Sequence, residues 1–310
     1  MRILKIWFNK GRGDYMKAWI KASRIPAQLF IFPALLLGQA IAFYNGYAMD
    51  IERVITIHLY GIFMHLFIVY GNDYADYESD KLNQTFTPFT GGSRVLVDNL
   101  LSKADLKKGF MLMGGLSIIM SVIMSFQAQS IYPVALVLIG LIIFQMYSFS
   151  PVKLSYRGYG ETLQVLGVGI ILPLIGYTVQ SGGFVGVLGI ILIALLPSQL
   201  AMALSTSMPD YPSDLKSQKH TTVVNFGTIV SKYLIITLYT LTAISLIMIN
   251  IDDLSLIYPL IGLLLTAGML VIMIKYSLKP GSLSLFYFVA LSIFINTYFV
   301  LSVGLQFILM

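Results

Sequence analysis

Long apolar segments, separated by short polar stretches, dominate the pattern of this chain. Runs of about 17 to 25 mostly apolar residues are long enough to cross the hydrocarbon layer of a bilayer as helices. A helix satisfies its backbone hydrogen bonds internally, which makes it the expected spanning element. We therefore predict an all-α, multi-pass membrane protein. Its nine predicted transmembrane helices cover residues 26–45, 53–71, 107–126, 131–148, 162–180, 184–206, 230–249, 254–274 and 283–308.

The composition supports a membrane location. Hydrophobic residues make up 57% of the 310 positions and charged residues only 11%, and the mean hydropathy is +0.82. Soluble proteins carry about 25% charged residues. The chain has no Cys, which excludes disulfides, thiolate metal sites and a thiol nucleophile. No small-residue cleavage site precedes the first apolar run, so we expect the first helix itself to direct insertion.

Basic residues are divided unevenly between the two sides that the predicted helices define. Nineteen of the 20 Lys and Arg precede the first helix or follow even-numbered helices, and only Arg53 falls on the other side. Because cytoplasmic loops carry the excess of Lys and Arg, we predict a protein of the cytoplasmic (inner) membrane with a cytoplasmic N-terminus. We expect one membrane domain over residues 1–310, in which 1–25 form a basic cytoplasmic segment. Topology then explains the net charge of +6, and the lipid bilayer, not nucleic acid, is the expected partner.

Acidic residues gather in two short stretches that each follow an apolar segment. Six of the 14 Asp and Glu lie in Asn72–Asp80, the first acidic cluster, and in Asp210–Asp214, the second acidic cluster. Both clusters fall in predicted cytoplasmic loops. Within each cluster the aspartates are three or four residues apart, a spacing that places them on one face of a helix.

Carboxylates this close together repel each other, and the low-dielectric boundary of the bilayer strengthens the repulsion. A single acidic cluster at a helix end is most simply a solvated cap, but two clusters favour a bound cation. Magnesium binds through one or two carboxylates together with substrate phosphates, which suits two clusters that share a diphosphate. We predict Mg²⁺ as the cofactor, held by Asn72, Asp73, Asp76, Asp80, Asp210 and Asp214.

The two clusters resemble the motifs of the UbiA superfamily of membrane prenyltransferases. In that superfamily, Asn-Asp-x-x-Asp-x-x-x-Asp and a second Asp-x-x-x-Asp bind magnesium and the diphosphate of an isoprenoid donor. Each cluster matches its motif in full, and Lys219 and Thr221 stand where the family commonly has Lys-x-Thr. The resemblance covers nearly the whole chain. It implies a nine-helix bundle of the UbiA type with a cytoplasm-facing active site.

A third segment resembles one subfamily within this superfamily. Residues Tyr147–Glu161 are similar to a loop of dihydroxynaphthoate polyprenyltransferases that often ends in Arg-Gly-x-Gly-Glu. Thr90–Arg94 is similar to a glycine-rich segment that follows the first motif in some relatives. Ser207–Pro209 departs from the Asn-x-Arg-like triplet usual before the second motif of the dihydroxynaphthoate enzymes. This departure leaves the identity of the acceptor open.

The chemistry of prenyl transfer indicates further site residues. Metal ions, Lys and Arg stabilise the departing diphosphate, and aromatic side chains can shelter an allylic cation. Relatives that resemble this chain often carry an Arg at the position of Arg24, where it contacts the acceptor. We predict catalytic roles for Asp73, Asp76, Lys153 and Arg157. The predicted substrate and diphosphate contacts are Arg24, Arg94, Tyr147, Lys153, Arg157 and Lys219.

We therefore expect a prenyltransferase that moves a polyprenyl group from polyprenyl diphosphate to an aromatic quinone precursor. The loop similarity ranks 1,4-dihydroxy-2-naphthoate, in menaquinone biosynthesis, first among the acceptors. The alternatives are 4-hydroxybenzoate, haem, chlorophyllide and glycerol-phosphate lipids. From other classes, a cation-binding transporter and a non-catalytic lipid-binding scaffold remain open, although transporters bind their ions near the bilayer midplane.

Polar and small residues inside the predicted helices receive structural interpretations. His58 and His65 lie seven residues apart on one helix face, and we predict that they form hydrogen bonds between helices. Gly167, Gly169 and Gly176 are predicted to be positions where helices pack closely.

Overall fold

The computed structural model of the protein describes residues 12–87, 90–184, 186–249 and 255–310. Every secondary-structure element in these ranges is helical, which confirms the all-α prediction. The elements are α2 (Arg12–Ala22), η1 (Ile25–Phe30), α3 (Phe32–Tyr44), α4 (Ile51–Ala75), α5 (Tyr77–Leu82), α6 (Lys103–Ala128), α7 (Tyr132–Ser148), η2 (Leu154–Tyr156), α8 (Gly160–Gln164), η3 (Val165–Ile171), α9 (Leu172–Ser181), α10 (Gly186–Ser207), α11 (Tyr211–Lys216), α12 (Thr222–Met248), α13 (Ile257–Lys275) and α14 (Leu283–Leu309).

The long helices agree with the predicted spans in position. Within the described ranges, eight helical segments are long and apolar enough to cross a membrane, and α7, with 17 residues, is shorter. The count of nine spans therefore stays a prediction. The first predicted span is divided into η1 and α3, each of which has a proline among its first residues. Proline lacks the N–H that would continue the preceding helix, so it favours a new start.

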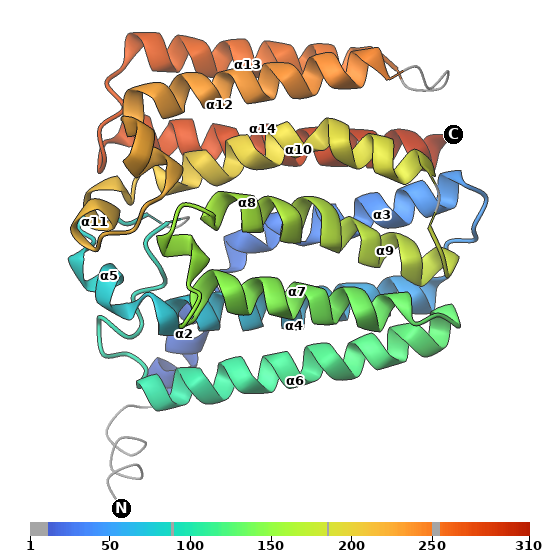
Figure 1. The fold of residues 1–310 in the computed structure, drawn as a ribbon, viewed down its shortest axis with the longest axis horizontal. Helices are drawn as coiled ribbons and strands as arrows, with labels where there is room; N and C mark the ends of the chain where they lie inside the picture. The colour runs from blue at the N-terminus through green and yellow to red at the C-terminus, as the bar shows by residue number, and fades with distance from the viewer. Residues whose placement is uncertain (1–11, 88–89, 185, 250–254) are drawn as a thin grey trace, which may run out of the picture.

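The helices lie side by side in one bundle (Figure 1). Helices α6 and α4 pack together at one edge and α12 and α13 at the other, and α3 packs on both α9 and α14 near the centre. Residues of α3 and α9 belong to both of the largest apolar clusters, which join them to α4, α6 and α7 on one side and to α10, α12 and α14 on the other. The pair α3 and α9 is therefore the centre of the core.

Close approach of α3 and α9 depends on Gly176. A Cβ atom at Gly176 would lie 2.1 Å from the carbonyl oxygen of Leu35, so no larger residue fits. Gly169 is also tightly packed, because a Cβ there would lie 3.1 Å from Cγ of Gln199. These two predictions of close packing are confirmed. The prediction is wrong for Gly167, where a Cβ would meet no atom within 4 Å.

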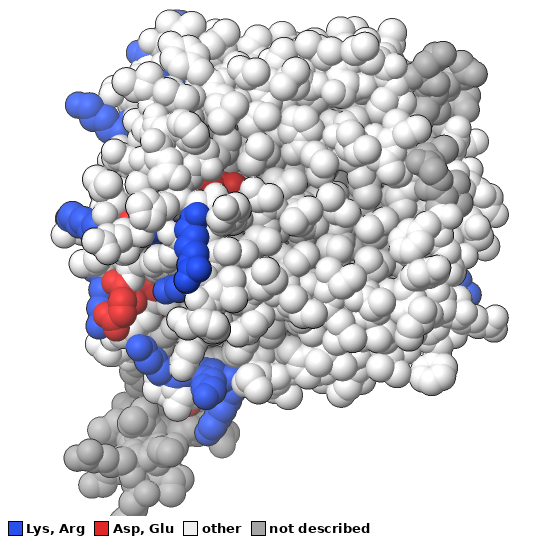
Figure 2. Space-filling model, viewed as in Figure 1, with Lys and Arg blue, Asp and Glu red and all other residues white. Residues whose placement is uncertain are grey.

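Charge separates the two ends of the bundle. On the face drawn in Figure 2, basic side chains gather at the end where Figure 1 places α5 and α11. Arg53 lies in the first turn of α4, at the opposite end, and donates to the carbonyl oxygens of Val179 at 3.2 Å and Gln180 at 2.8 Å. The predicted basic residues at positions 2, 5 and 10 lie outside the described residues. The charged end is the one that the topology prediction assigns to the cytoplasm.

Candidate active site

A cavity of about 260 Å³ opens among the helix ends at the charged end of the bundle. Its walls come from η1, α4, α7, α8, η3 and the end of α10, together with the short elements and loops between them. All six residues predicted to hold magnesium line this one pocket, although about 130 residues separate the two acidic clusters along the chain. The structure therefore brings both clusters to a single site.

The first acidic cluster spans a break between two helices. Helix α4 ends at Ala75, Asp76 has non-helical backbone angles, and α5 begins at Tyr77. Asp73 and Asp80 thus project from different helices, and not from the continuous helix face that their spacing suggests. The break turns the chain so that both carboxylates line the pocket.

The carboxylate of Asp73 is fixed by the loop that follows α5, whose described residues are 83–87 and 90–93 and which is here called the connecting loop. It accepts a hydrogen bond from the backbone N–H of Ser93 at 3.1 Å and another from the Ser93 hydroxyl. The guanidinium of Arg24 lies 3.9 Å from the same carboxylate. Asp73 is only 3% exposed, so these donors and this cation replace the water that it loses on folding.

Gly92 lets the connecting loop pass directly over the first acidic cluster. Its φ of +69° lies in the left-handed region, and a Cβ atom there would lie 2.2 Å from Oδ2 of Asp80. Burial, followed by the charges of the neighbouring carboxylates, raises the pKa of Asp80 to about 8. A cation beside Asp80 would relieve this repulsion.

The second acidic cluster is fixed by the same connecting loop. Asp210 accepts hydrogen bonds from Nδ2 of Asn83 at 2.7 Å and from the backbone N–H of Gly91 at 3.2 Å. Burial nevertheless raises its pKa. Burial also raises the pKa of Asp214, to about 7, because the attraction of Lys219 only partly offsets it. The connecting loop therefore holds the two clusters in one arrangement.

Lys219 joins the two clusters from the opposite side. Its Nζ atom lies 3.5 Å from Asp76 and 4.0 Å from Asp214, and 5.4 Å from the ring centre of Tyr156. The Tyr156 hydroxyl also donates to Asp76, at 3.2 Å. Burial by itself lowers the pKa of Lys219, but the carboxylates around it raise that pKa well above its ordinary value. Lys219 is therefore a fixed positive charge in the pocket.

The structure separates the predicted basic residues into two groups. Arg24 and Lys219 line the pocket, as does Tyr147. Arg94, Lys153 and Arg157 are not part of its lining. The Arg94 guanidinium donates to the backbone carbonyls of Asp80 and Asn83, where it supports the connecting loop.

The other two basic side chains are held by local contacts. Lys153 Nζ lies 3.7 Å from the ring centre of Tyr156, and Arg157 donates to the carbonyl oxygen of Pro151 at 3.1 Å. These contacts explain why neither side chain lines the pocket. The spacing of residues along a loop does not reveal such partners. For this reason the sequence predicted substrate contacts for all five basic residues alike.

Several pocket residues were not predicted from the sequence as site residues. Glu161 is buried, lines the pocket and accepts a hydrogen bond from the backbone N–H of Thr222 at 2.9 Å. Its position at the end of the Arg-Gly-x-Gly-Glu segment was the only sequence signal. Asn83 had no signal, because its role depends on Asp210, which lies 127 residues further along the chain.

His65 contributes to the pocket wall without contacting a carboxylate. Its Nε2 atom lies 2.6 Å from the carbonyl oxygen of Ser23, to which it donates from α4 toward the end of α2. His65 thus hydrogen-bonds from α4 to the turn that follows α2, and not to a second helix as predicted. His58 instead packs edge-on against Phe32, with ring centres 5.2 Å apart.

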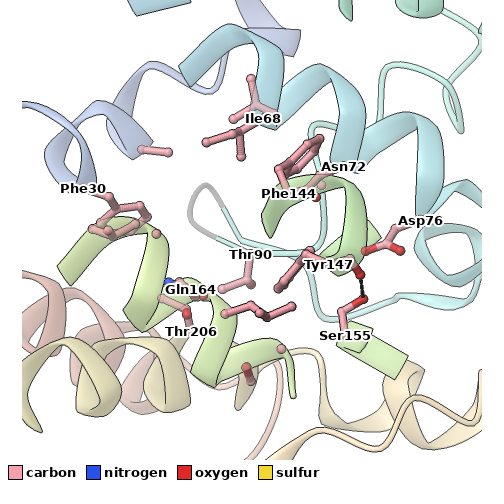
Figure 3. Close-up of a pocket in the computed structure, with 18 of the residues that line it drawn as sticks. Phe30, Ile68, Asn72, Asp76, Thr90, Phe144, Tyr147, Ser155, Gln164 and Thr206 are labelled. Atoms are coloured by element: carbon pink, nitrogen blue, oxygen red, sulfur yellow. Dashed lines mark hydrogen bonds between the residues drawn. The ribbon is translucent and has the colours of Figure 1, made fainter. Parts of the chain in front are cut away.

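Away from the carboxylates the pocket becomes apolar. Figure 3 shows Phe30, Ile68 and Phe144 around the cavity, with Asn72 and Asp76 further along the same wall. The other apolar lining residues include Ile31, Met64, Ile143, Val168, Ile171 and Leu172. One cavity thus has a charged end at the rim and an apolar end inside the bundle, which is the shape required by an amphiphile with an anionic head.

The donor set suits magnesium that is shared with a phosphorylated ligand. Among the described residues, no three carboxylate or histidine side chains converge closely enough to form a complete metal site by themselves. Magnesium usually binds through one or two carboxylates and takes its other ligands from substrate phosphates and water. The oxygen-only donors of the two clusters fit that pattern.

Comparison with solved structures shows the same architecture in other proteins. A UbiA homologue from Archaeoglobus fulgidus, bound to DMAPP and Mg²⁺, has a TM-score of 0.63 and 18% identity, over 94% of this chain and 99% of that one. The apo UbiA homologue from Aeropyrum pernix K1 has a TM-score of 0.69 and 13% identity, over 92% and 98%. A digeranylgeranylglyceryl phosphate synthase has a TM-score of 0.63 and 17% identity, over 96% and 99%.

The family comparison rests on sequence. No curated protein matches the chain. The model of the UbiA prenyltransferase family, in contrast, matches residues 30–298, which include both acidic clusters and the loops between the long helices. With the helical bundle and the two-ended pocket, this match shows that the chain belongs to the UbiA prenyltransferase family of membrane enzymes.

Proposed function

We propose that this enzyme transfers a polyprenyl group from polyprenyl diphosphate to an aromatic acceptor, with Mg²⁺ bound by the two acidic clusters. One observation carries the proposal: a single pocket joins five aspartates and two cations at one end to an apolar cavity at the other. A prenyl diphosphate has the same division between an anionic head and a hydrocarbon tail. The charged end then faces the cytoplasm, in agreement with the excess of basic residues there.

The diphosphate would lie between the two clusters, whose aspartates Asp73, Asp76, Asp80, Asp210 and Asp214 all line the pocket. Bound magnesium would supply Lewis-acid stabilisation of the departing diphosphate. Lys219 already lies between the clusters, and Arg24 lies beside Asp73. Both side chains can neutralise the charge that grows on the leaving oxygen as the bond breaks.

In the proposed reaction, the bond between C1 of the prenyl chain and the diphosphate oxygen breaks, and diphosphate leaves with the electron pair. A ring carbon of the acceptor then donates an electron pair to C1 and forms the new carbon–carbon bond. The ring becomes aromatic again when that carbon loses the group it carried, a proton or carbon dioxide. Aromatic side chains such as Phe144 and Tyr147 line the pocket, where they exclude water and shelter the positive charge at C1.

For the acceptor we propose 1,4-dihydroxy-2-naphthoate, in menaquinone biosynthesis. The support is the Arg-Gly-x-Gly-Glu segment, whose terminal Glu161 lines the pocket. Solved neighbours are described as bound to DMAPP or GPP with Mg²⁺, which supports the donor class. Another neighbour is a digeranylgeranylglyceryl phosphate synthase, so glycerol-phosphate lipids belong in the acceptor panel.

The test is a membrane assay with labelled geranylgeranyl diphosphate, a panel of acceptors, and magnesium either present or chelated. We expect a prenylated naphthoate product that requires magnesium. Product with 4-hydroxybenzoate alone would correct the acceptor and keep the reaction. Absence of both product and diphosphate release with every acceptor, combined with metal-dependent ion flux in liposomes, would replace the proposal with a transporter.

A further inference from the structure

The boundary between the charged and apolar ends of the pocket carries a neutral polar side chain, Gln164. It is the last residue of α8 and lines the cavity one helical turn beyond Glu161, on the same helix face. The next lining residues on this segment, Val168 and Ile171, are apolar. The helix also changes to a π-helix directly after Gln164, a form that is often found at functional sites.

The amide of Gln164 is available to a ligand. Among the described residues, its half-buried side chain forms no hydrogen bond. An amide group offers two donors and an acceptor, and a polar group inside an apolar wall is stable only when these are paired with water or a ligand. In Figure 3, Gln164 lies next to Thr206 of α10, a helix that contacts α8.

Thr206 adds an acceptor at the same place. Its hydroxyl donates to the backbone carbonyls of Met202 and Ala203, at 3.2 and 3.0 Å, so its oxygen can still accept a hydrogen bond. Thr206 also lines the pocket. Together the two side chains provide both donors and acceptors without adding charge.

We propose that Gln164 forms a hydrogen bond with a ring hydroxyl of the aromatic acceptor and thereby orients the ring toward C1 of the prenyl chain. This inference rests on the proposed function. With the diphosphate among the aspartates and the tail in the apolar end, the bond that breaks lies where the wall changes from charged to apolar, which is the level of Gln164. A neutral amide recognises a hydroxyl there without placing another charge beside the developing cation.

The electrostatics of the pocket favour this division of roles. Six carboxylates and two cations line the cavity, and both cations, Arg24 and Lys219, already lie beside carboxylates. Neither cation is therefore left to recognise a neutral hydroxyl. Gln164 is a binding and positioning residue for the acceptor and has no role in the departure of diphosphate.

The test compares the wild type with Gln164→Leu and with the matched control Gln199→Leu. Gln199 is a buried glutamine whose Oε1 has no partner among the described residues, and it packs against Gly169, outside the pocket lining. For Gln164→Leu we expect the KM for 1,4-dihydroxy-2-naphthoate to rise at least about tenfold, while the KM for geranylgeranyl diphosphate changes by less than about twofold. The control should change neither value.

Acceptor analogues that lack one ring hydroxyl complete the test. In the wild type, removal of the hydroxyl that Gln164 binds should raise the acceptor KM. In Gln164→Leu the same removal should leave the acceptor KM unchanged. Gln164→Asn keeps an amide on a shorter side chain, so its acceptor KM should lie between those of the wild type and Gln164→Leu. If Gln164→Leu does not fold in detergent, this variant and the analogue series in the wild type decide the question.

Two results would overturn the inference while leaving the proposed function intact. One is an unchanged acceptor KM in a folded, active Gln164→Leu enzyme. The other is an equal rise in the acceptor KM of the wild type and of Gln164→Leu when each ring hydroxyl is removed from the acceptor. If the wild type makes no magnesium-dependent product with any acceptor, the proposed function fails, and the role of Gln164 fails with it.

Discussion

In the first acidic cluster, Asp73 accepts hydrogen bonds from Ser93, whereas in the second cluster Asp210 accepts them from Asn83 and Gly91. All of these donors belong to the connecting loop. Each cluster also contains an aspartate, Asp80 or Asp214, whose carboxylate accepts no hydrogen bond from the described residues. Each cluster thus combines anchored aspartates, Asp73 and Asp76 in the first and Asp210 in the second, with one aspartate that is not anchored.

The difference between the anchored and unanchored aspartates indicates what each contributes. Hydrogen-bonded carboxylates fix the position of the two clusters relative to each other, because one loop holds both. Asp80 and Asp214 are buried with fewer partners, and their pKa values are raised to about 8 and about 7. These two carboxylates gain most from a bound cation. The clusters differ in their nearest cations, since Lys219 lies within 4.0 Å of a carboxylate of each cluster, while Arg24 lies 3.9 Å from Asp73 of the first.

The largest expected effect is that of removing an anchored carboxylate. We expect Asp73→Ala and Asp210→Ala each to lower turnover by at least about 1,000-fold, because both metal binding and the arrangement of the connecting loop are lost. Magnesium-dependent product formation in membranes measures the effect. The control is Asp50→Asn, which keeps a capping side chain at the start of α4. Full activity in either alanine variant would contradict the proposed function.

Replacement of Lys219 tests whether the two clusters share one cation. Lys219→Gln should lower kcat by about 100-fold, because the charge that faces the leaving diphosphate is lost. The matched variant Lys153→Gln removes a lysine that is not part of the pocket lining, and its kcat should change by less than about threefold. Equal losses in the two variants would support the catalytic role that the sequence predicts for Lys153.

Gly92→Ala tests whether the connecting loop holds the two acidic clusters in place. The new methyl group would meet Oδ2 of Asp80, and φ is +69°, so the loop must shift away from both clusters. We expect about a tenfold rise in the magnesium concentration needed for half-maximal activity. Gly115→Ala on α6, where a Cβ meets no atom within 4 Å, serves as the control and should leave the requirement unchanged.

The smallest effect concerns pH. The pKa values of Asp80 and Asp214 are raised to about 8 and about 7, so in the metal-free protein at neutral pH Asp80 is mostly protonated and Asp214 partly protonated. Magnesium must displace these protons, so its affinity should increase several-fold per pH unit as the pH rises through this range. Titration of activity with magnesium at several pH values measures the change. A weaker pH dependence is expected in Asp80→Asn, and an unchanged one would contradict the assignment.

Residues that act together over a long distance along the chain could not be found from the sequence. Asn83 and Ser93 are ordinary loop residues until folding places them against Asp210 and Asp73. Gln164 lies within the predicted apolar span 162–180, and nothing in its sequence neighbourhood marked it as a site residue. Arg94 and Arg157 looked equivalent to Lys219, but their side chains bind backbone carbonyls and neither residue is part of the pocket lining. Motif spacing records which residues are near in the chain, whereas the partners of a side chain depend on packing.

The sequence by itself determined the membrane class, the positions of the long helices, the two acidic clusters and the family resemblance. These features depend on local composition, because apolar segment length and the density of charge are properties of consecutive residues. Only the tertiary structure decided that both clusters line one pocket, that Lys219 and Arg24 are the cations within it, and that Gln164 lies at its boundary. Those facts depend on contacts between helices that are distant in the chain, and packing of the whole bundle sets them.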